Sequence, residues 1–149
     1  MSTNTAEIRV GRLLEVRIAA GYRTVEDVDH LFDMLDTAVG RLPPGTQHVT
    51  AADWTRCAVM TPMATTRLRE RMALTNPRTQ RSAVLVVPDM PTAVVQFLRV
   101  IREAKHPDRK LFFSASELVT FLGEVLTPEE TERVRQFFTE LPAPSRPLP

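Results

Sequence analysis

The chain has 149 residues, of which 43% are hydrophobic and 25% charged, and its formal net charge is +1. This composition supports one folded domain and excludes a largely disordered chain. A net charge so close to zero creates no global field that would attract nucleic acid or a membrane surface, so we expect neither as a partner. The charge is unevenly distributed, because residues 46–110 hold eleven Lys/Arg against five Asp/Glu.

The compartment is predicted from what the sequence lacks. Cys57 is the single cysteine, so no disulfide forms within the chain, which fits a reducing environment. The first residues have neither a basic start nor an apolar stretch, so they do not form a signal peptide. The apolar runs are far shorter than a membrane span. We therefore expect a cytoplasmic protein.

The first third of the chain predicts a strand or hairpin, a helix and a second strand. Residues 8–20 alternate, with Val16 and Ile18 on one face and Glu15 and Arg17 on the other, as in a half-buried strand. A helix follows. Thr24 caps its start, and the glycine and proline residues at 40–45 mark its end. Residues 47–54 then read as a strand that ends in a polar residue.

The rest of the chain continues the alternation. Thr61 followed by Pro62 predicts the start of a helix, and residues 82–87 predict a strand covered on both faces. Residues 92–104 predict a helix, 110–113 a short strand, and 114–126 another helix. A capping box at residues 127–130 opens a last helix.

Two of these helices yield core predictions. Leu98 and Leu122 are expected in the core, on helices that cover the sheet, whereas Val95 and Val100 are expected off the core face of their helix.

Strands that alternate with helices predict an α/β fold with a mostly parallel mixed sheet of four to five strands and layered helices. The expected organisation is a flexible N-terminus at 1–7, a single domain at 8–141 and a Pro-rich tail at 142–149.

The sequence offers no catalytic, cofactor or metal site. The five glycines are isolated, so no glycine-rich turn is present to bind phosphate. The three histidines, His30, His48 and His106, have no ligand spacing, and Cys57 has no base nearby in the sequence. We therefore expect neither an enzyme nor a cofactor.

Asp53 ends a predicted strand, as the phosphorylated aspartate of a response-regulator receiver does. A receiver also needs an acidic pair after its first strand to hold magnesium, and residues 19–22 here are Ala-Ala-Gly-Tyr. The sequence therefore excludes that reading. The structural alternative is that Asp53 binds the N–H groups of the next loop while Trp54 covers the edge of the core.

The order of elements, together with four segments of sequence, resembles the STAS-like, SpoIIAA-like fold of anti-sigma-factor antagonists and related bacterial regulators. The segments are RSAVLV at 81–86, FLR at 97–99, RKLFF at 109–113 and ELVTFL at 117–122. The resemblance covers roughly residues 8–126. It implies a non-catalytic protein that acts by binding other proteins.

Antagonists of this type carry an Asp-Ser pair at the start of the second helix, and a partner kinase phosphorylates the serine. Here residues 59–63 are Val-Met-Thr-Pro-Met, so Thr61 is the only hydroxyl at that helix cap and no acid precedes it. Thr61 is therefore either a modified residue or only a helix cap.

The resulting hypothesis is a bacterial regulatory or scaffolding module that acts by protein–protein interaction. Its predicted partner-binding surface is the rim at the carboxyl ends of the strands, with Asp53, Trp54 and Thr61, extended by Arg67 and Arg71. Arg67 and Arg71 are four residues apart on one helix face and would suit an acidic segment of a partner. The alternative is a small-molecule or lipid carrier with an apolar pocket.

Overall fold

The computed structural model describes residues 4–19, 22–57 and 60–140. The strands are β1 Thr5–Ile8, β2 Leu13–Arg17, β3 His48–Asp53, β4 Thr79–Leu85 and β5 Arg109–Phe112. The helices are α1 Val25–Val39, α2 Pro62–Thr75, α3 Pro91–Ala104, α4 Ala115–Gly123 and α5 Pro128–Thr139, with a short 3₁₀ helix, η1, at Asn76–Arg78. The predicted Pro-rich tail at 142–149 lies outside the described residues.

Local sequence signals fix where most helices begin. The hydroxyls of Thr24 and Thr127 each accept a hydrogen bond from the backbone N–H of the third helical residue. The carboxylate of that residue accepts one from the backbone N–H of the cap, so both sites are full capping boxes. Thr61 and Ser114 cap α2 and α4 with their hydroxyls. These caps satisfy N–H groups that the first turn of a helix leaves unpaired.

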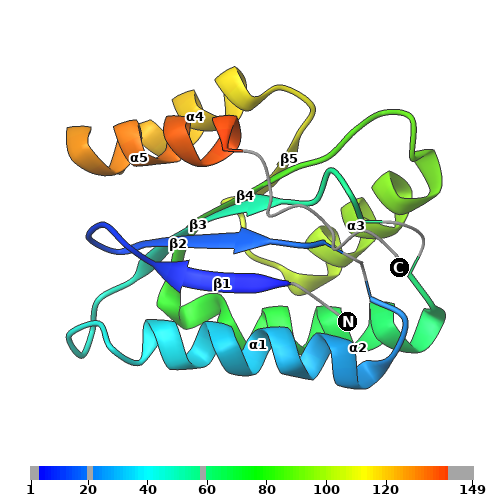
Figure 1. Ribbon diagram of the computed structural model, residues 1–149. Coiled ribbons are helices and arrows are strands. Elements are labelled where there is room, and N and C mark those ends of the chain that lie inside the picture. Colours follow the sequence, from blue (N-terminus) through cyan, green and yellow to red (C-terminus); the bar gives the residue numbers. More distant parts are fainter. Residues whose placement is uncertain (1–3, 20–21, 58–59, 141–149) are drawn as a thin grey trace, which may run out of the picture.

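The five strands form one sheet in the order β1-β2-β3-β4-β5. β1 pairs antiparallel with β2, and the other neighbouring pairs are parallel. The predicted mixed, mostly parallel sheet is confirmed. Each crossover from β2 to β5 carries one helix, and right-handed crossovers that progress in one direction place all three helices on the same face. Figure 1 shows α1, α2 and α3 below the sheet and α4 and α5 above it.

The two faces of the sheet have separate cores. On the α1–α3 face, Leu14, Val16 and Ile18 pack with apolar side chains of the helices. On the other face, Leu13, Val49, Ala51 and Ala83 pack against α4 and α5. Val49 and Ala51 are completely buried, as expected for a central strand covered on both sides.

The N-terminal region differs from the prediction in two respects. The first strand begins at Thr5, so residues 5–7 belong to the sheet and not to a flexible segment. Glu15 was expected on the open face of a half-buried strand, but it is 3% exposed because α5 covers that face. There the Arg133 guanidinium donates to both Glu15 carboxylate oxygens, at 2.8 and 2.7 Å, which compensates for the buried charge.

The prediction for α3 is partly wrong. Leu98, expected in the core, is 43% exposed, and Val100, expected off the core face, is completely buried, as are Val94 and Phe97 to within 9% exposure. The buried stripe includes Ala93 and Ala104 and so lies further around the helix, where α3 packs against α2. Leu122 is completely buried, and that prediction is confirmed.

Candidate functional site

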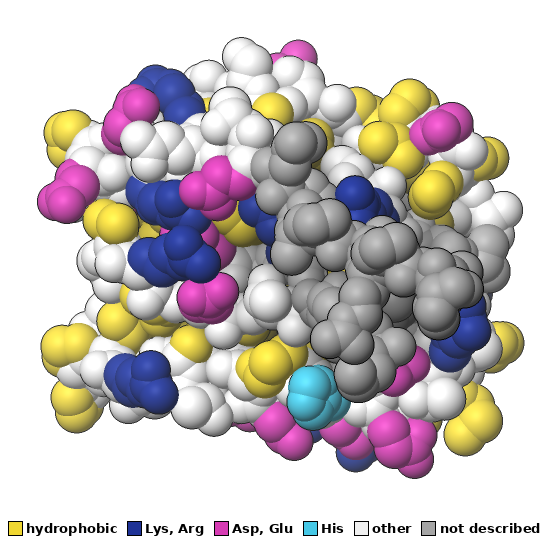
Figure 2. Space-filling view, in the orientation of Figure 1, with side chains coloured by type: hydrophobic (Ala, Val, Ile, Leu, Met, Phe, Trp, Pro, Cys, Tyr) yellow, Lys and Arg dark blue, Asp and Glu magenta, His cyan; other side chains and the backbone are white. Residues whose placement is uncertain are grey.

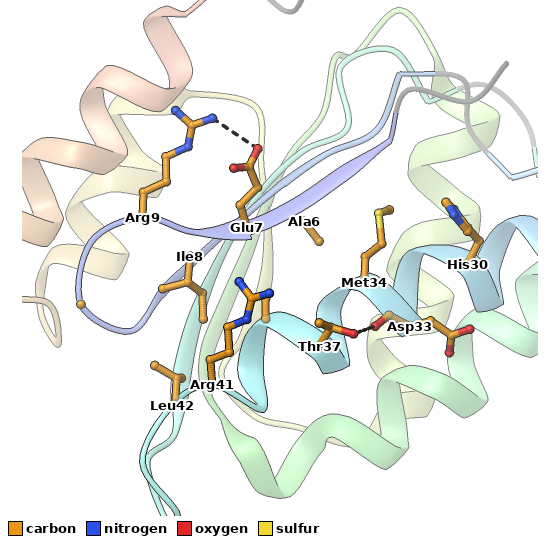
Figure 3. A pocket seen from close by; sticks show the side chains of 12 residues that line it. Ala6, Glu7, Ile8, Arg9, His30, Asp33, Met34, Thr37, Arg41 and Leu42 are labelled. Carbon is orange, nitrogen blue, oxygen red and sulfur yellow. Dashed lines mark hydrogen bonds and ion pairs between the residues drawn. The ribbon is translucent and has the colours of Figure 1, made fainter.

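A surface groove of about 730 Å³ runs between the edge strand β1 and helix α1. In Figure 3, Ala6 and Ile8 of β1 point toward α1, and Met34 and Arg41 approach from the helix side. Ala6, Ile8 and Met34 are half-buried, so the groove has an apolar floor. Its volume lies in the range of functional pockets, roughly 300–1,000 Å³.

Among the residues that the structure describes, β1 is an edge strand of the sheet and lies beside this groove. Its hydrogen-bonded neighbour in the sheet is β2, and it lies at one end of the strand order. In an antiparallel pair every second residue of an edge strand directs its N–H and C=O away from the partner strand, and these groups form a template for a further strand. The groove therefore combines apolar side-chain contacts with a strand edge to which no further described strand is paired.

The charges around the groove are of both signs. Glu7 and Arg9 form an ion pair at 3.2 Å, and Asp33 contacts Arg71 at 3.3 Å. Arg41 is exposed and has no ion-pair partner among the residues that the structure describes. Figure 2 shows basic and acidic side chains interspersed on this face of the molecule. Arg41 is therefore an exposed cation at the groove that a ligand can reach.

Asp53 and Trp54, both predicted to bind a partner, are buried. Asp53 is 9% exposed, and its carboxylate accepts hydrogen bonds from the Thr55 N–H and hydroxyl and from the Arg17 guanidinium. Trp54 is 5% exposed, and its ring packs between those of Tyr22 and Phe97. The structural alternative, in which Asp53 holds the next loop and Trp54 covers the core edge, therefore describes both residues.

Thr61 caps α2 and remains on the surface. Its hydroxyl oxygen accepts from the Ala64 N–H at 3.2 Å, and the hydroxyl donates to the Arg23 carbonyl at 3.0 Å. Both capacities of the hydroxyl are thus used to hold α2 against the start of α1. This geometry describes Thr61 as a cap.

Arg67 and Arg71 lie on one face of α2, as predicted, but acids of the same chain occupy them. Arg67 donates to both carboxylate oxygens of Asp29 at 2.8 and 3.1 Å. Arg71 contacts Asp29, Asp33 and Asp36 at 3.1 to 3.3 Å. The hydrogen bonds and charge of Arg67, aided by Arg71, lower the pKa of Asp29. Acids of helix α1 therefore pair with both arginines that were predicted to meet an acidic segment of a partner.

A second, smaller hollow lies inside the core between the sheet and α1–α3. This interior cavity has a volume of about 50 Å³, and polar side chains line it together with apolar ones. It is too small for a lipid, because lipid and drug-sized ligands need several hundred Å³. The Tyr22 hydroxyl and His48 Nδ1 are buried there without a hydrogen-bond partner among the described residues.

Sequence reasoning missed three features. The groove depends on β1, which the prediction placed outside the domain. The burial of Tyr22 and Arg109 depends on contacts between distant elements. The sequence does contain a signal for the edge strand, because Gly11 can form the turn of a short hairpin and residues 5–8 precede it.

The described ranges contain no cluster of three or more His, Cys, Asp or Glu side chains that could hold a metal ion. Within the same ranges, no helix has the length and apolar character needed to cross a membrane.

Comparison with known proteins is informative at the level of structure. No protein-family model matches the sequence, and no curated protein matches it either. Among solved structures, the chain is similar to an uncharacterized protein of the DUF3478 family from Shewanella loihica PV-4, described as having a SpoIIAA-like fold. The TM-score is 0.57, the identity is 14%, and the match covers 82% of this chain and 95% of that one. The likeness agrees with the strand order and the resemblance seen in the sequence: the chain has the SpoIIAA-like fold.

Proposed function

We propose that this protein is a non-catalytic regulatory or scaffolding module that binds an extended segment of another protein along β1. The observation that carries the proposal is that a strand edge to which no further described strand is paired lies beside a groove of about 730 Å³. Recognition by strand addition uses this combination, in which main-chain hydrogen bonds provide affinity and adjoining pockets select side chains.

The chemistry of the groove defines the partner segment. Side chains of an added strand that face α1 would meet Ala6, Ile8 and Met34, so small apolar residues fit there. Residues that lie near Arg41 would meet an exposed cation to which no described carboxylate is paired, which favours Asp or Glu. The partner segment is therefore extended, apolar at alternate positions and acidic at one end.

Selection of short random peptides on the full-length chain tests this proposal. Selected peptides should be extended sequences of that pattern, and fluorescence anisotropy measures their affinity. Thr37→Trp fills the groove from an exposed position on α1, and Arg41→Glu reverses its charge. Each change should weaken binding by about tenfold or more, as expected at the centre of an interface.

Two variants on α3 serve as controls. Arg99→Trp and Arg102→Glu introduce the same side chains at exposed positions outside the groove, and both should bind like the wild type. If the groove variants bind as tightly as these controls, the docking site lies elsewhere. If the chain instead dimerises through β1, as size-exclusion chromatography with light scattering would reveal, the occupant is a second copy and the proposed partner is wrong.

We extend the proposal to a bacterial cytoplasmic setting. A buried, single Cys57 is compatible with a reducing compartment, and the similar structure comes from a bacterium.

A further inference from the structure

Helix α2 carries two large apolar side chains on its outer side. The helix buries Ala64, Leu68 and Met72 against the core. On the opposite side, Met63 is 72% and Leu74 is 76% exposed, the highest values among the large hydrophobic side chains of the described residues. They are eleven positions apart, which is about three helical turns, so the two side chains share one face at roughly 16–17 Å along the axis. Single exposed hydrophobic residues are ordinary, so their arrangement decides what this face does.

The charged residues between them are symmetric about the same midpoint. Arg67 follows Met63 by four positions, and Glu70 precedes Leu74 by four positions. The side chains of Arg67 and Glu70 are 39% and 50% exposed, so both reach the surface of the stripe. The order along α2 is therefore apolar, basic, acidic, apolar. The same order read in the opposite direction is apolar, acidic, basic, apolar, which is its electrostatic complement.

We infer that this α2 stripe, formed by Met63, Arg67, Glu70 and Leu74, binds the same stripe of a second copy of the chain. The two α2 helices are antiparallel, and a two-fold axis passes through the midpoint of the stripe. This arrangement sets Met63 opposite Leu74 of the second copy and Arg67 opposite Glu70 of the second copy. Contacts in a two-fold interface are reciprocal, so each of these contacts forms twice. A parallel arrangement would set like charges at the same height, which disfavours it.

Hollows lie at both ends of the stripe. One of about 330 Å³ borders Met63 and is lined by Val25 of α1 as well as by residues of α2. The other, of about 360 Å³, borders Leu74. Arg67 and Glu70 line both hollows, so each hollow adjoins the middle of the stripe. In the antiparallel pair, Leu74 of the second copy enters the first hollow and Met63 of the second copy enters the other, so an apolar side chain meets a recess at each end.

The acids of α1 beside the stripe limit the strength of this contact. Arg67 pairs with Asp29 as well as with Glu70, and Arg71 pairs with three acids of α1. These pairs neutralise part of the negative charge that two copies bring together. Two apolar side chains and one ion pair from each copy form a small interface, so we expect a Kd of about 1–100 µM. The inference is independent of the docking groove on β1.

Analytical ultracentrifugation of the full-length chain between about 1 and 300 µM measures this equilibrium. Met63→Gln and Leu74→Gln each remove an apolar contact that forms twice, and each should raise the Kd by about tenfold or more. Val95→Gln is the matched control, because Val95 is 66% exposed on the neighbouring helix α3, and its Kd should stay within about twofold. Thr37→Trp lies in the β1 groove and should also leave the Kd unchanged. A chain that is monomeric at about 300 µM, or a dimer that Thr37→Trp weakens and Leu74→Gln does not, would overturn the inference.

Disulfide cross-linking tests the antiparallel register directly. Met63→Cys and Leu74→Cys each add one exposed thiol, whereas the native Cys57 is buried. When the two variants are mixed and oxidised, the disulfide between position 63 of one copy and position 74 of the other should form about tenfold faster than a disulfide between two identical variants. Intact-mass spectrometry separates the three products. Equal rates for all three, or faster cross-linking of either variant with itself, would contradict the register and overturn the inference.

Discussion

The turn between β1 and β2 should tolerate no side chain at position 11. Gly11 has a φ of +57°, and a Cβ built there would overlap the carboxylate of Glu130 on α5. That carboxylate accepts from the Arg12 N–H at 2.8 Å and from the Thr127 N–H at 2.9 Å. Gly11→Ala must therefore displace a group that caps α5 and holds the hairpin at the same time.

The expected cost has two parts. A non-glycine residue in the left-handed region costs roughly 1–2 kcal/mol. Displacing Glu130 weakens two hydrogen bonds to a charged group, which adds roughly 1–2 kcal/mol. Gly11→Ala should thus lower the free energy of unfolding by about 2–4 kcal/mol. For a chain of 149 residues this corresponds to a fall in Tm of roughly 5–15 °C.

Thermal and urea unfolding followed by circular dichroism measure this loss. Gly45→Ala is the matched control, because Gly45 also has a positive φ, of +83°, but a Cβ there meets nothing within 4 Å. It should show the conformational cost alone. In a Glu130→Ala background the extra cost at Gly11 should disappear. Equal losses for Gly11→Ala and Gly45→Ala in the wild-type background would refute the reasoning about Glu130.

Three further predictions concern the core. Leu122→Ala should lower the free energy of unfolding by roughly 2–5 kcal/mol in urea titrations. Leu98→Ala, on the exposed side of α3, should lower it by less than about 1 kcal/mol. Similar losses for the two variants would show that Leu98 is a core residue. The pKa of His48 is lowered from 6.5 to about 4, so between these pH values the unfolded chain binds a proton that the folded chain does not. The free energy of unfolding should therefore fall by up to roughly 3 kcal/mol as the pH falls from about 6.5 to about 4. His48→Gln should flatten this slope in urea titrations, and an unchanged slope would contradict the assignment. Burial raises the pKa of the Cys57 thiol to about 12, so a thiol reagent at pH 8 should react with it at the rate of unfolding, and rapid reaction of the folded protein would contradict its burial.

Local patterns predicted the elements because local interactions determine where helices begin. Thr24 and Thr127 cap helices through residues three positions away, and alternation around Val16 identifies the strand β2. What covers each element depends on residues far away in the sequence. Alternation around Glu15 shows two different faces, but the partner that buries Glu15 is Arg133, 118 residues later.

The same limit applies to the two arginines that were predicted to bind a partner. Spacing correctly placed Arg67 and Arg71 on one face of α2, but the acids of α1 that oppose them are paired by tertiary packing. Helical spacing favoured Leu98 as a core residue of α3, because it lies four residues after Val94 and shares a helix face with it. Close packing of α3 on α2 selects the face with Ala93 and Ala104 instead.

The most direct test of the proposed docking mode is the amide exchange of β1, measured by NMR with and without a selected peptide. The account predicts that bound peptide slows exchange of the outward-facing amides between Thr5 and Ile8, and that nuclear Overhauser effects join the peptide to Ala6 or Ile8. Protection confined to α2 and α3, with unchanged exchange in β1, would contradict it.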